Sequence, residues 1–174
     1  MMKALIVVDM QNDFLTGSLA NPDAVAIIPK IKELIKSKEY DYIVFTCDTH
    51  FENYLDTPEG KSLPIEHCVT QEGWEITKEF DEFFDDDDYY ISELRKATFG
   101  TIQLADHLDG LGQFDEVTFC GTCTDICVIS NALILKAMRP ALTINVKADC
   151  CAGVTKEKHE AALEVMKSCL INII

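Results

Sequence analysis

The segment CGTCTDICV, residues 120–128, holds three of the eight cysteines of this 174-residue chain. Three sulfurs this close together suit a metal site, a disulfide, or a reaction centre with one nucleophilic thiolate. Cys120 ends the apolar run EVTFC and is expected to pack in a strand as a small hydrophobic residue. Cys127 falls in the first turn of a predicted helix, where free backbone N–H groups and the helix dipole favour a thiolate. Cys127 is therefore the cysteine best placed for nucleophilic chemistry.

A nucleophilic thiol needs a group that accepts its proton and later protonates the leaving group, together with a stabilising charge. No histidine stands at a suggestive spacing from Cys127, so a Cys–His pair is not indicated. Asp9 and Lys96 each stand at the end of a predicted strand and could supply an acid–base group and a cation. Taken singly, Asp9 suits a loop cap and Lys96 a surface charge. The remaining cysteines are expected to be buried or incidental thiols: Cys47, Cys68, Cys150, Cys151 and Cys169.

The elements that must position these residues alternate along the chain. Short apolar, β-branched segments predict six strands, at 3–9, 41–46, 89–94, 116–120, 141–146 and 170–174. Helical spacing of apolar residues separates most of them, at 24–35 after an Asn21-Pro22 cap, 102–108, 124–138 and 156–169. This alternation is typical of a three-layer αβα fold with Rossmann-like topology, in which helices cover both faces of a parallel sheet. We expect one domain, residues 1–174.

Ligands of such sheets bind beyond the carboxyl ends of the strands. The predicted strands end in polar or reactive residues, namely Asp9, Asp48 with His50, Lys96, the 120–127 segment and Asp149. The segment 51–84 carries no strand pattern, and we expect it to be a long functional loop.

The net charge of −15 argues against nucleic acids and anionic membranes as partners. Much of the excess lies in the run 79–90, EFDEFFDDDDYY, which we interpret as a solvated surface segment, since it lacks the glycine of a calcium-binding loop. No apolar run approaches the about 20 residues of a membrane helix. The first residues lack the cleavage site of a signal peptide, so we expect a cytoplasmic protein with reduced thiols.

Three segments resemble the landmarks of the isochorismatase-like cysteine hydrolases: DMQNDF (9–14), KATF (96–99) and GTCTDICVISNA (121–132). They occur in the expected order and spacing, and the likeness covers essentially the whole chain. The resemblance implies a six-stranded parallel sheet and a catalytic triad of Asp9, Lys96 and Cys127. It also implies a cis peptide bond at Thr122–Cys123, with the amides of Cys123 and Cys127 forming an oxyanion hole. Isochorismatases proper lack the nucleophilic cysteine, so its presence indicates amide hydrolysis through a thioester.

A second set of residues suits a metal ion. Two imidazoles and two carboxylates suit zinc, iron or manganese, and they are supplied here by Asp48, His50, Glu59 and His67. Alone, the pair Asp48 and His50 is a weak signal that unrelated surface residues would also give. The set as a whole is similar to the metal site of nicotinamidases, in which the metal binds the pyridine nitrogen of nicotinamide.

The same resemblance implies that Phe14, Leu63 and Phe99 line the substrate pocket, and Trp74 either closes the pocket or packs at the surface. Two features depart from the pattern. Leu63 stands where an aromatic residue is common, and Pro64-Ile65-Glu66 replaces the usual pair of prolines before His67.

Together these features predict a nicotinamidase, with a small-molecule amide substrate and self-association into a homo-oligomer as is common in the family. Another amidase of the same family, acting on a carbamoyl or ureido substrate without metal, is the first alternative. A non-catalytic thiol- or metal-binding protein is the second. It predicts metal bound through sulfur and leaves Asp9 and Lys96 unexplained.

Overall fold

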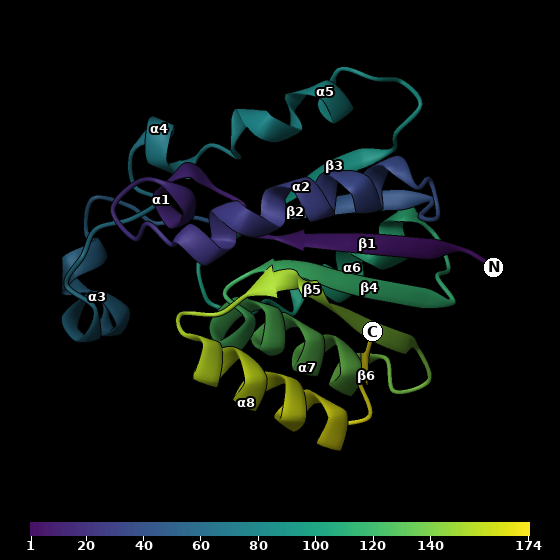
Figure 1. Ribbon diagram of the computed structural model, residues 1–174. Helices are drawn as coiled ribbons and strands as arrows, with labels where there is room; N and C mark the ends of the chain where they lie inside the picture. The colour runs from purple at the N-terminus through teal and green to yellow at the C-terminus, as the bar shows by residue number, and fades with distance from the viewer.

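The computed structural model describes residues 1–174 and contains one six-stranded sheet in the order β3-β2-β1-β4-β5-β6 (Figure 1). The strands are β1 (Lys3–Val8), β2 (Tyr42–Asp48), β3 (Ile91–Lys96), β4 (Glu116–Thr122), β5 (Thr143–Ala152) and β6 (Asn172–Ile173). Every pairing between neighbouring strands is parallel, which confirms the predicted sheet. The chain leaves β1 toward β2 on one side and returns to β4 on the other. The carboxyl ends of β1 and β4 therefore form the topological switch point at which such folds bind ligands.

Four longer helices cover the sheet: α2 (Pro22–Lys36), α6 (Gln103–Leu111), α7 (Ile129–Met138) and α8 (Lys156–Ser168). In Figure 1, α2 lies in front of the sheet and α6 behind it. α2 packs on β4 and β5, and α7 packs against both α6 and α8. Helices thus cover both faces, as predicted. None of the helices combines the length and the apolar character needed to cross a membrane.

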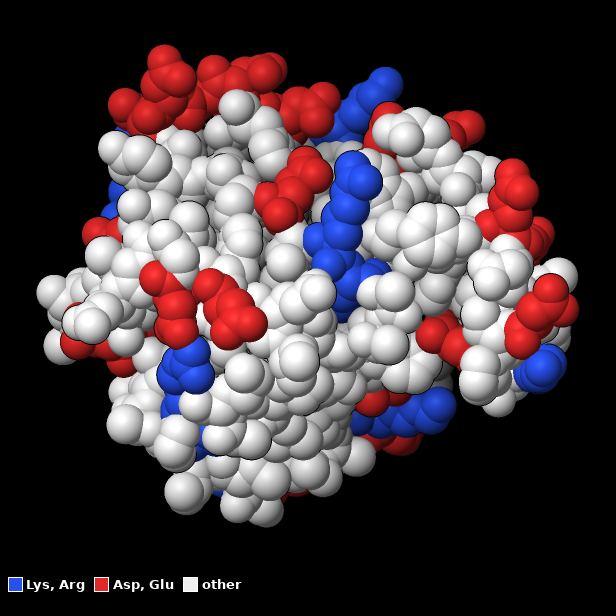
Figure 2. Space-filling model, turned by 180° about the vertical axis from the view of Figure 1, so that it is seen from behind, with Lys and Arg blue, Asp and Glu red and all other residues white.

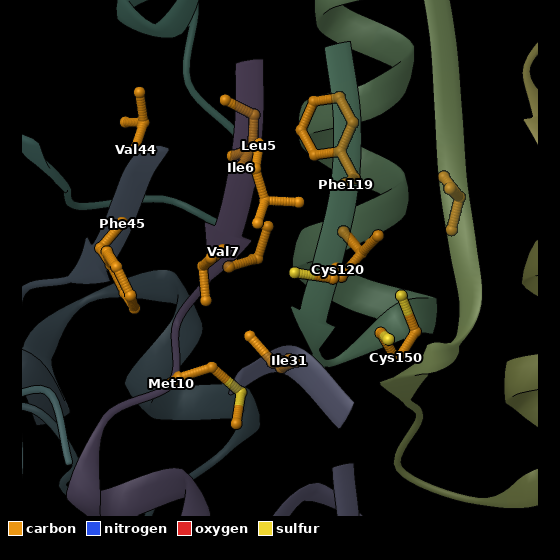
Figure 3. Packing of buried hydrophobic residues seen from close by; sticks show 14 of the residues in the cluster. Leu5, Ile6, Val7, Met10, Ile31, Val44, Phe45, Phe119, Cys120 and Cys150 are labelled. Carbon is orange, nitrogen blue, oxygen red and sulfur yellow. The ribbon is translucent and has the colours of Figure 1, made fainter. Parts of the chain in front are cut away.

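The centre of the core is formed by β1 and its two neighbouring strands, and buried side chains of the helices complete it. Residues 4–8 of β1 are completely buried, and their side chains lie between those of β2 and β4 (Figure 3). Cys120 is among them, fully buried and free of any disulfide, as predicted for a small hydrophobic residue. Burial of the central strand on both faces fixes where its carboxyl end emerges, and Asp9 is the first residue beyond it.

The end of the fifth strand, β5, differs most from the prediction. The fifth strand does not end before Asp149 but continues to Ala152, with an irregular register between Phe119 and Gly121 of the neighbouring strand. Asp149 lies inside this strand with its side chain exposed, 3.4 Å from Lys147. It therefore does not stand at the carboxyl end of the strand, and the prediction that it does is wrong.

The segment 51–84 is not an open loop. It contains five short helical turns: η1 (Tyr54–Asp56), α3 (Pro58–Ser62), α4 (Gln71–Trp74), η2 (Lys78–Phe80) and α5 (Asp81–Phe84). α4 packs against another short helix, α1 (Asn12–Leu15). Figure 2 shows acidic side chains gathered along the top of the molecule, on the side where α5 lies in Figure 1. The run 79–90 is nonetheless more than a solvated segment, because Phe80 and Phe83 are buried in the core.

Candidate active site and metal centre

The side chains of Asp9, Lys96 and Cys127 meet at the carboxyl end of the sheet. Asp9 follows β1, Lys96 is the last residue of β3, and Cys127 lies in a π-helical turn, η3 (Thr124–Val128), between β4 and α7. Lys96 Nζ lies 2.7 Å from Asp9 Oδ2 and 3.8 Å from Cys127 Sγ. All three residues are at most 6% exposed. An acid, a cation and a thiol from distant parts of the sequence are thus in contact.

The backbone holds Asp9 in a single orientation. Its φ of +49° lies in the left-handed region, and its N–H donates to the Thr46 carbonyl at 3.1 Å. The Thr46 hydroxyl donates to Asp9 Oδ1 at 2.6 Å. Oδ2 is buried and has no partner apart from the ion pair with Lys96. This oxygen is therefore free to accept a proton from a neighbouring group.

Burial governs the protonation of the three groups. It raises the pKa of Asp9; Lys96 opposes this shift and Asp48 adds to it. It raises the pKa of the Cys127 thiol well above the usual value, since the nearby Asp9 adds to the rise and Lys96 only partly offsets it. Burial alone would lower the pKa of Lys96, but Asp9, Cys127 and Asp48 raise it by more. Burial thus favours the thiol form of Cys127, beside the carboxyl group of Asp9 and the cation of Lys96, and opposes the effect of the helix start.

The turn before Cys127 has an unusual backbone. The peptide bond Thr122–Cys123, where the family resemblance implies a cis bond, is cis. Gly121 has a φ of +109°, and a Cβ there would stand 2.2 Å from the Val8 carbonyl oxygen, so only glycine fits. The Cys123 carbonyl accepts hydrogen bonds from three consecutive amides, those of Ile126, Cys127 and Val128.

The two amides predicted for the oxyanion hole differ in their partners. The Cys123 N–H donates to no protein acceptor, while the Cys127 N–H donates to the Cys123 carbonyl at 2.8 Å. This is the shortest of the three bonds to that carbonyl, so the Cys127 amide already has a protein acceptor. The Cys123 amide is the freer donor of the two.

Asp48, His50, Glu59 and His67 form a second cluster beside the first. One ligand atom from each residue lies within 4.8 Å of the other three. His50 Nε2 is 3.0 Å from Asp48 Oδ2 and 3.5 Å from Glu59 Oε1, and His67 Nε2 is 3.6 Å from both oxygens. Burial alone would raise the pKa of Asp48, but hydrogen bonds from the two histidines hold it below its usual range.

These four residues fit a divalent metal ion. Glu59 Oε1 is buried without any hydrogen-bond partner, an unfavourable state for a carboxylate oxygen unless a cation completes it. His67 Nδ1 lies 2.8 Å from the Ile65 carbonyl and donates to it, so Nε2 is the nitrogen that faces the cluster and that would bind a metal ion in place of its proton. Two imidazoles and two carboxylates are ligands that zinc, iron and manganese accept. Asp48 also joins the two clusters, because its Oδ1 lies 3.1 Å from Lys96 Nζ.

A cavity of about 430 Å³ opens onto both clusters. Phe14, Leu63 and Phe99 line it, together with Cys127 and the ligands Asp48, Glu59 and His67. A larger depression of about 520 Å³ lies between α6 and α7 at the opposite edge of the sheet, where no triad or ligand residue is present. The smaller cavity is therefore the candidate substrate pocket.

Some of the lining could not be read from the sequence. Leu19, Ile126, Val154 and Lys158 also line the pocket, and their sequence context carries no signal for this role. Trp74 does not line it. Its ring stacks on Arg95, with the guanidinium carbon 4.4 Å from the ring centre, and its Nε1 donates to Thr49 Oγ1.

Known proteins of similar sequence and structure were found over the full length of the chain. The family model described as the isochorismatase domain matches residues 3–174. A nicotinamidase/pyrazinamidase of Mycobacterium tuberculosis is 31% identical over 185 residues, covering 99% of this chain and 98% of that protein. The pyrazinamidase of Pyrococcus horikoshii, solved in complex with zinc, is 34% identical with a TM-score of 0.77 and covers 100% and 99% of the two chains. The nicotinamidase PncA of Bacillus subtilis is 26% identical with a TM-score of 0.78, covering 99% of each chain.

Proposed function

Because the chain belongs to the isochorismatase family, we propose that it is a cysteine amidohydrolase that converts nicotinamide to nicotinate and ammonia. One observation carries the proposal: the contact of Lys96 with both Asp9 and Cys127, in a cavity that also exposes a set of metal ligands. The similarity to nicotinamidases and pyrazinamidases supports the choice of an aromatic amide. Self-association, a cytoplasmic location and a single domain stay predictions.

In the acylation half-reaction, the carboxamide lies over Cys127 with its oxygen toward the Cys123 amide. Asp9 accepts the thiol proton as the sulfur attacks the carbonyl carbon, and Lys96 stabilises the negative charge on the sulfur. When the tetrahedral intermediate collapses, the C–N bond breaks and Asp9 returns the proton to the departing nitrogen. Ammonia leaves, and the acyl group is bound to Cys127 as a thioester.

In the deacylation half-reaction, Asp9 accepts a proton from water as the water oxygen attacks the thioester carbonyl. The C–S bond then breaks, the acid is released and the sulfur regains a proton from Asp9. Lys96 keeps its charge throughout, consistent with its raised pKa. Asp9 alternates between base and acid, a role that its otherwise unpartnered Oδ2 permits.

Asp48, His50, Glu59 and His67 would hold the metal ion, and we propose zinc, with iron or manganese as alternatives. A bound ion would supply a Lewis acid able to coordinate the ring nitrogen of the substrate. Phe14 and Phe99 supply apolar walls for that ring.

The test uses purified full-length protein with nicotinamide, pyrazinamide, an aliphatic amide and a ureido compound, and measures ammonia with and without chelator. We expect release from the two aromatic amides, lost on chelation and restored by zinc. Cys127→Ala should reduce the rate of ammonia release at least about a thousandfold. Cys169→Ala, at an exposed cysteine, is the matched control and should retain full activity. A Cys127→Ala protein that still releases ammonia would contradict the proposed mechanism.

The same experiment separates the alternatives. Ammonia from the ureido compound in the presence of chelator would identify the metal-independent amidase. The thiol-dependent binding protein gains no support from the structure, because the cluster of metal-compatible side chains contains no cysteine.

A further inference from the structure

We propose that Asp13 is a positioning residue for the metal centre, holding ligand His67 in place through the peptide group of Cys68. The inference rests on the metal site of the proposed function. Asp13 belongs to the segment 9–14, in which the proposed mechanism uses only the first and last residues. Nothing in that mechanism explains why a carboxylate stands at this position.

The contact is direct. Asp13 Oδ2 accepts a hydrogen bond from the Cys68 N–H at 2.7 Å. On its other side, the Cys68 carbonyl accepts from the N–H of His50 at 3.2 Å. Cys68, which follows ligand His67, is therefore hydrogen-bonded through its N–H to Asp13 and through its carbonyl to ligand His50. The two histidines are linked through this one residue.

Cys68 needs such a restraint. Its φ of +51° lies in the left-handed region, which residues other than glycine rarely adopt. A short, charge-assisted hydrogen bond to its amide can hold it there. Without that bond the backbone would relax toward a more favourable conformation and would carry the adjacent His67 with it. His67 Nε2 lies 3.6 Å from both Asp48 Oδ2 and Glu59 Oε1, so a displacement of its backbone would change its distances to the other ligands.

The Asp13 carboxylate is itself enclosed by backbone. A Cβ at Gly17 would stand 2.3 Å from its Oδ1, and one at Gly73 would stand 2.2 Å from its Oδ2. The Ser18 N–H donates to Oδ1 at 3.3 Å. Two glycines thus allow the chain to close around the carboxylate, which fixes the oxygen that faces Cys68. Phe14, the next residue, places its ring 5.6 Å from that of His67.

The test measures zinc affinity of the metal-free protein by competition with a chromophoric chelator. Loss of an outer contact to a metal ligand lowers affinity about 10–100-fold, and we expect that loss for Asp13→Ala. Asp13→Asn keeps an oxygen that can accept the hydrogen bond from the Cys68 N–H, so its zinc affinity should lie between those of Asp13→Ala and the wild type. Asp115→Ala is the matched control, since Asp115 Oδ2 accepts from the Met2 N–H at 2.8 Å at the far edge of the sheet. It should bind zinc as wild type does.

A second readout separates positioning from general damage. The rate at which iodoacetamide alkylates Cys127 in metal-free protein reports on the contact of Lys96 with Cys127, of which His67 is not a part. We expect this rate to be unchanged in Asp13→Ala, and excess zinc to restore the KM for nicotinamide. Wild-type zinc affinity in Asp13→Ala, or a parallel fall in alkylation, would overturn the inference. If wild type binds zinc but does not hydrolyse nicotinamide, while Asp13→Ala still loses zinc, the proposed substrate fails and the inference stands.

Discussion

Replacing Lys96 by methionine should destabilise the protein as well as inactivate it. Lys96 is 3% exposed, and its Nζ lies 2.7 Å from Asp9 Oδ2 and 3.1 Å from Asp48 Oδ1. Methionine has a similar length but no charge, so two buried carboxylates lose their shared cation. Breaking a buried ion pair by removing one partner costs about 3–5 kcal/mol. We therefore expect metal-free Lys96→Met to lose at least about 3 kcal/mol of unfolding free energy near neutral pH.

The loss should depend on pH in a defined direction. In the wild type, burial raises the pKa of Asp9 and Lys96 opposes that shift, so the substitution raises the pKa of Asp9 further. A carboxyl group whose pKa is higher in the folded than in the unfolded state destabilises the fold when it is ionised. That destabilisation disappears as the pH falls through the folded-state pKa. The difference between Lys96→Met and wild type should therefore be largest at mildly alkaline pH and smaller in mild acid.

The assay is urea unfolding of the chelator-treated proteins in mild acid and at mildly alkaline pH. Unfolding is monitored by the fluorescence of Trp74, the single tryptophan. The matched control is Lys32→Met, which breaks ion pairs with Glu79 and Glu82 at the surface. Exposed pairs contribute little, so this variant should stay close to wild type at both pH values. The reasoning is refuted if Lys96→Met loses no more stability than Lys32→Met, or if its deficit grows on acidification.

Three further predictions follow from single contacts. Gly121→Ala should destabilise the fold by several kcal/mol in thermal unfolding, since the added Cβ would overlap the backbone of β1. In the control Gly110→Ala, the added Cβ has no other atom within 4 Å, so this variant should be neutral or slightly stabilising. Asn131→Leu should slow alkylation of Cys127, because the buried Asn131 side chain forms hydrogen bonds with the backbone of the segments that carry Lys96 and Cys127. The control Asn145→Leu, at a buried site in β5, should lower stability but leave this alkylation unchanged. Tyr54→Phe should lose about 0.5–1.5 kcal/mol of unfolding free energy in denaturant, because the hydrogen bond from the Tyr54 hydroxyl to the Leu63 carbonyl is removed. Its zinc affinity in chelator competition should be unchanged, because the ring that packs on His50 and His67 remains.

The elements that carry the site were readable from the sequence because their signals are local. Continuous apolar runs predicted the strands, and a polar residue at the end of such a run must emerge at the carboxyl edge. This reasoning placed Asp9 and Lys96 at that edge, whereas the metal ligand set that includes Asp48 and His50 was implied by the family resemblance. The same logic failed at Asp149, where a register irregularity lets the strand continue past polar residues. An irregularity of this kind depends on the partner strand and leaves no mark in the sequence of β5 alone.

Features that depend on long-range contacts could not be predicted. The short helices of 51–84 have weak intrinsic preference and are held from outside; the Asn12 side chain, for example, donates to the Glu72 carbonyl. The sequence left open whether Trp74 closes the pocket or packs at the surface, and only the fold shows that it packs on Arg95 outside the pocket. The helix start favours a thiolate at Cys127, whereas burial, which raises the pKa of the thiol, is a property of the folded chain that the sequence does not show.

The segment that follows β1 explains why the catalytic triad and the metal-ligand cluster lie side by side. Asp9 supplies the acid–base group, and two residues later the Gln11 side chain holds both backbone atoms of Asp48, donating to its carbonyl at 2.9 Å and accepting from its N–H at 2.7 Å. Asp13 holds the residue after the second histidine ligand, and Phe14 forms the pocket wall beside it. The central strand has neighbours on both sides, so the residues leaving it reach the ends of β2 and β4 at once. An edge strand reaches one neighbour only, and the same six residues placed there could order the metal ligands or the thiol, but not both.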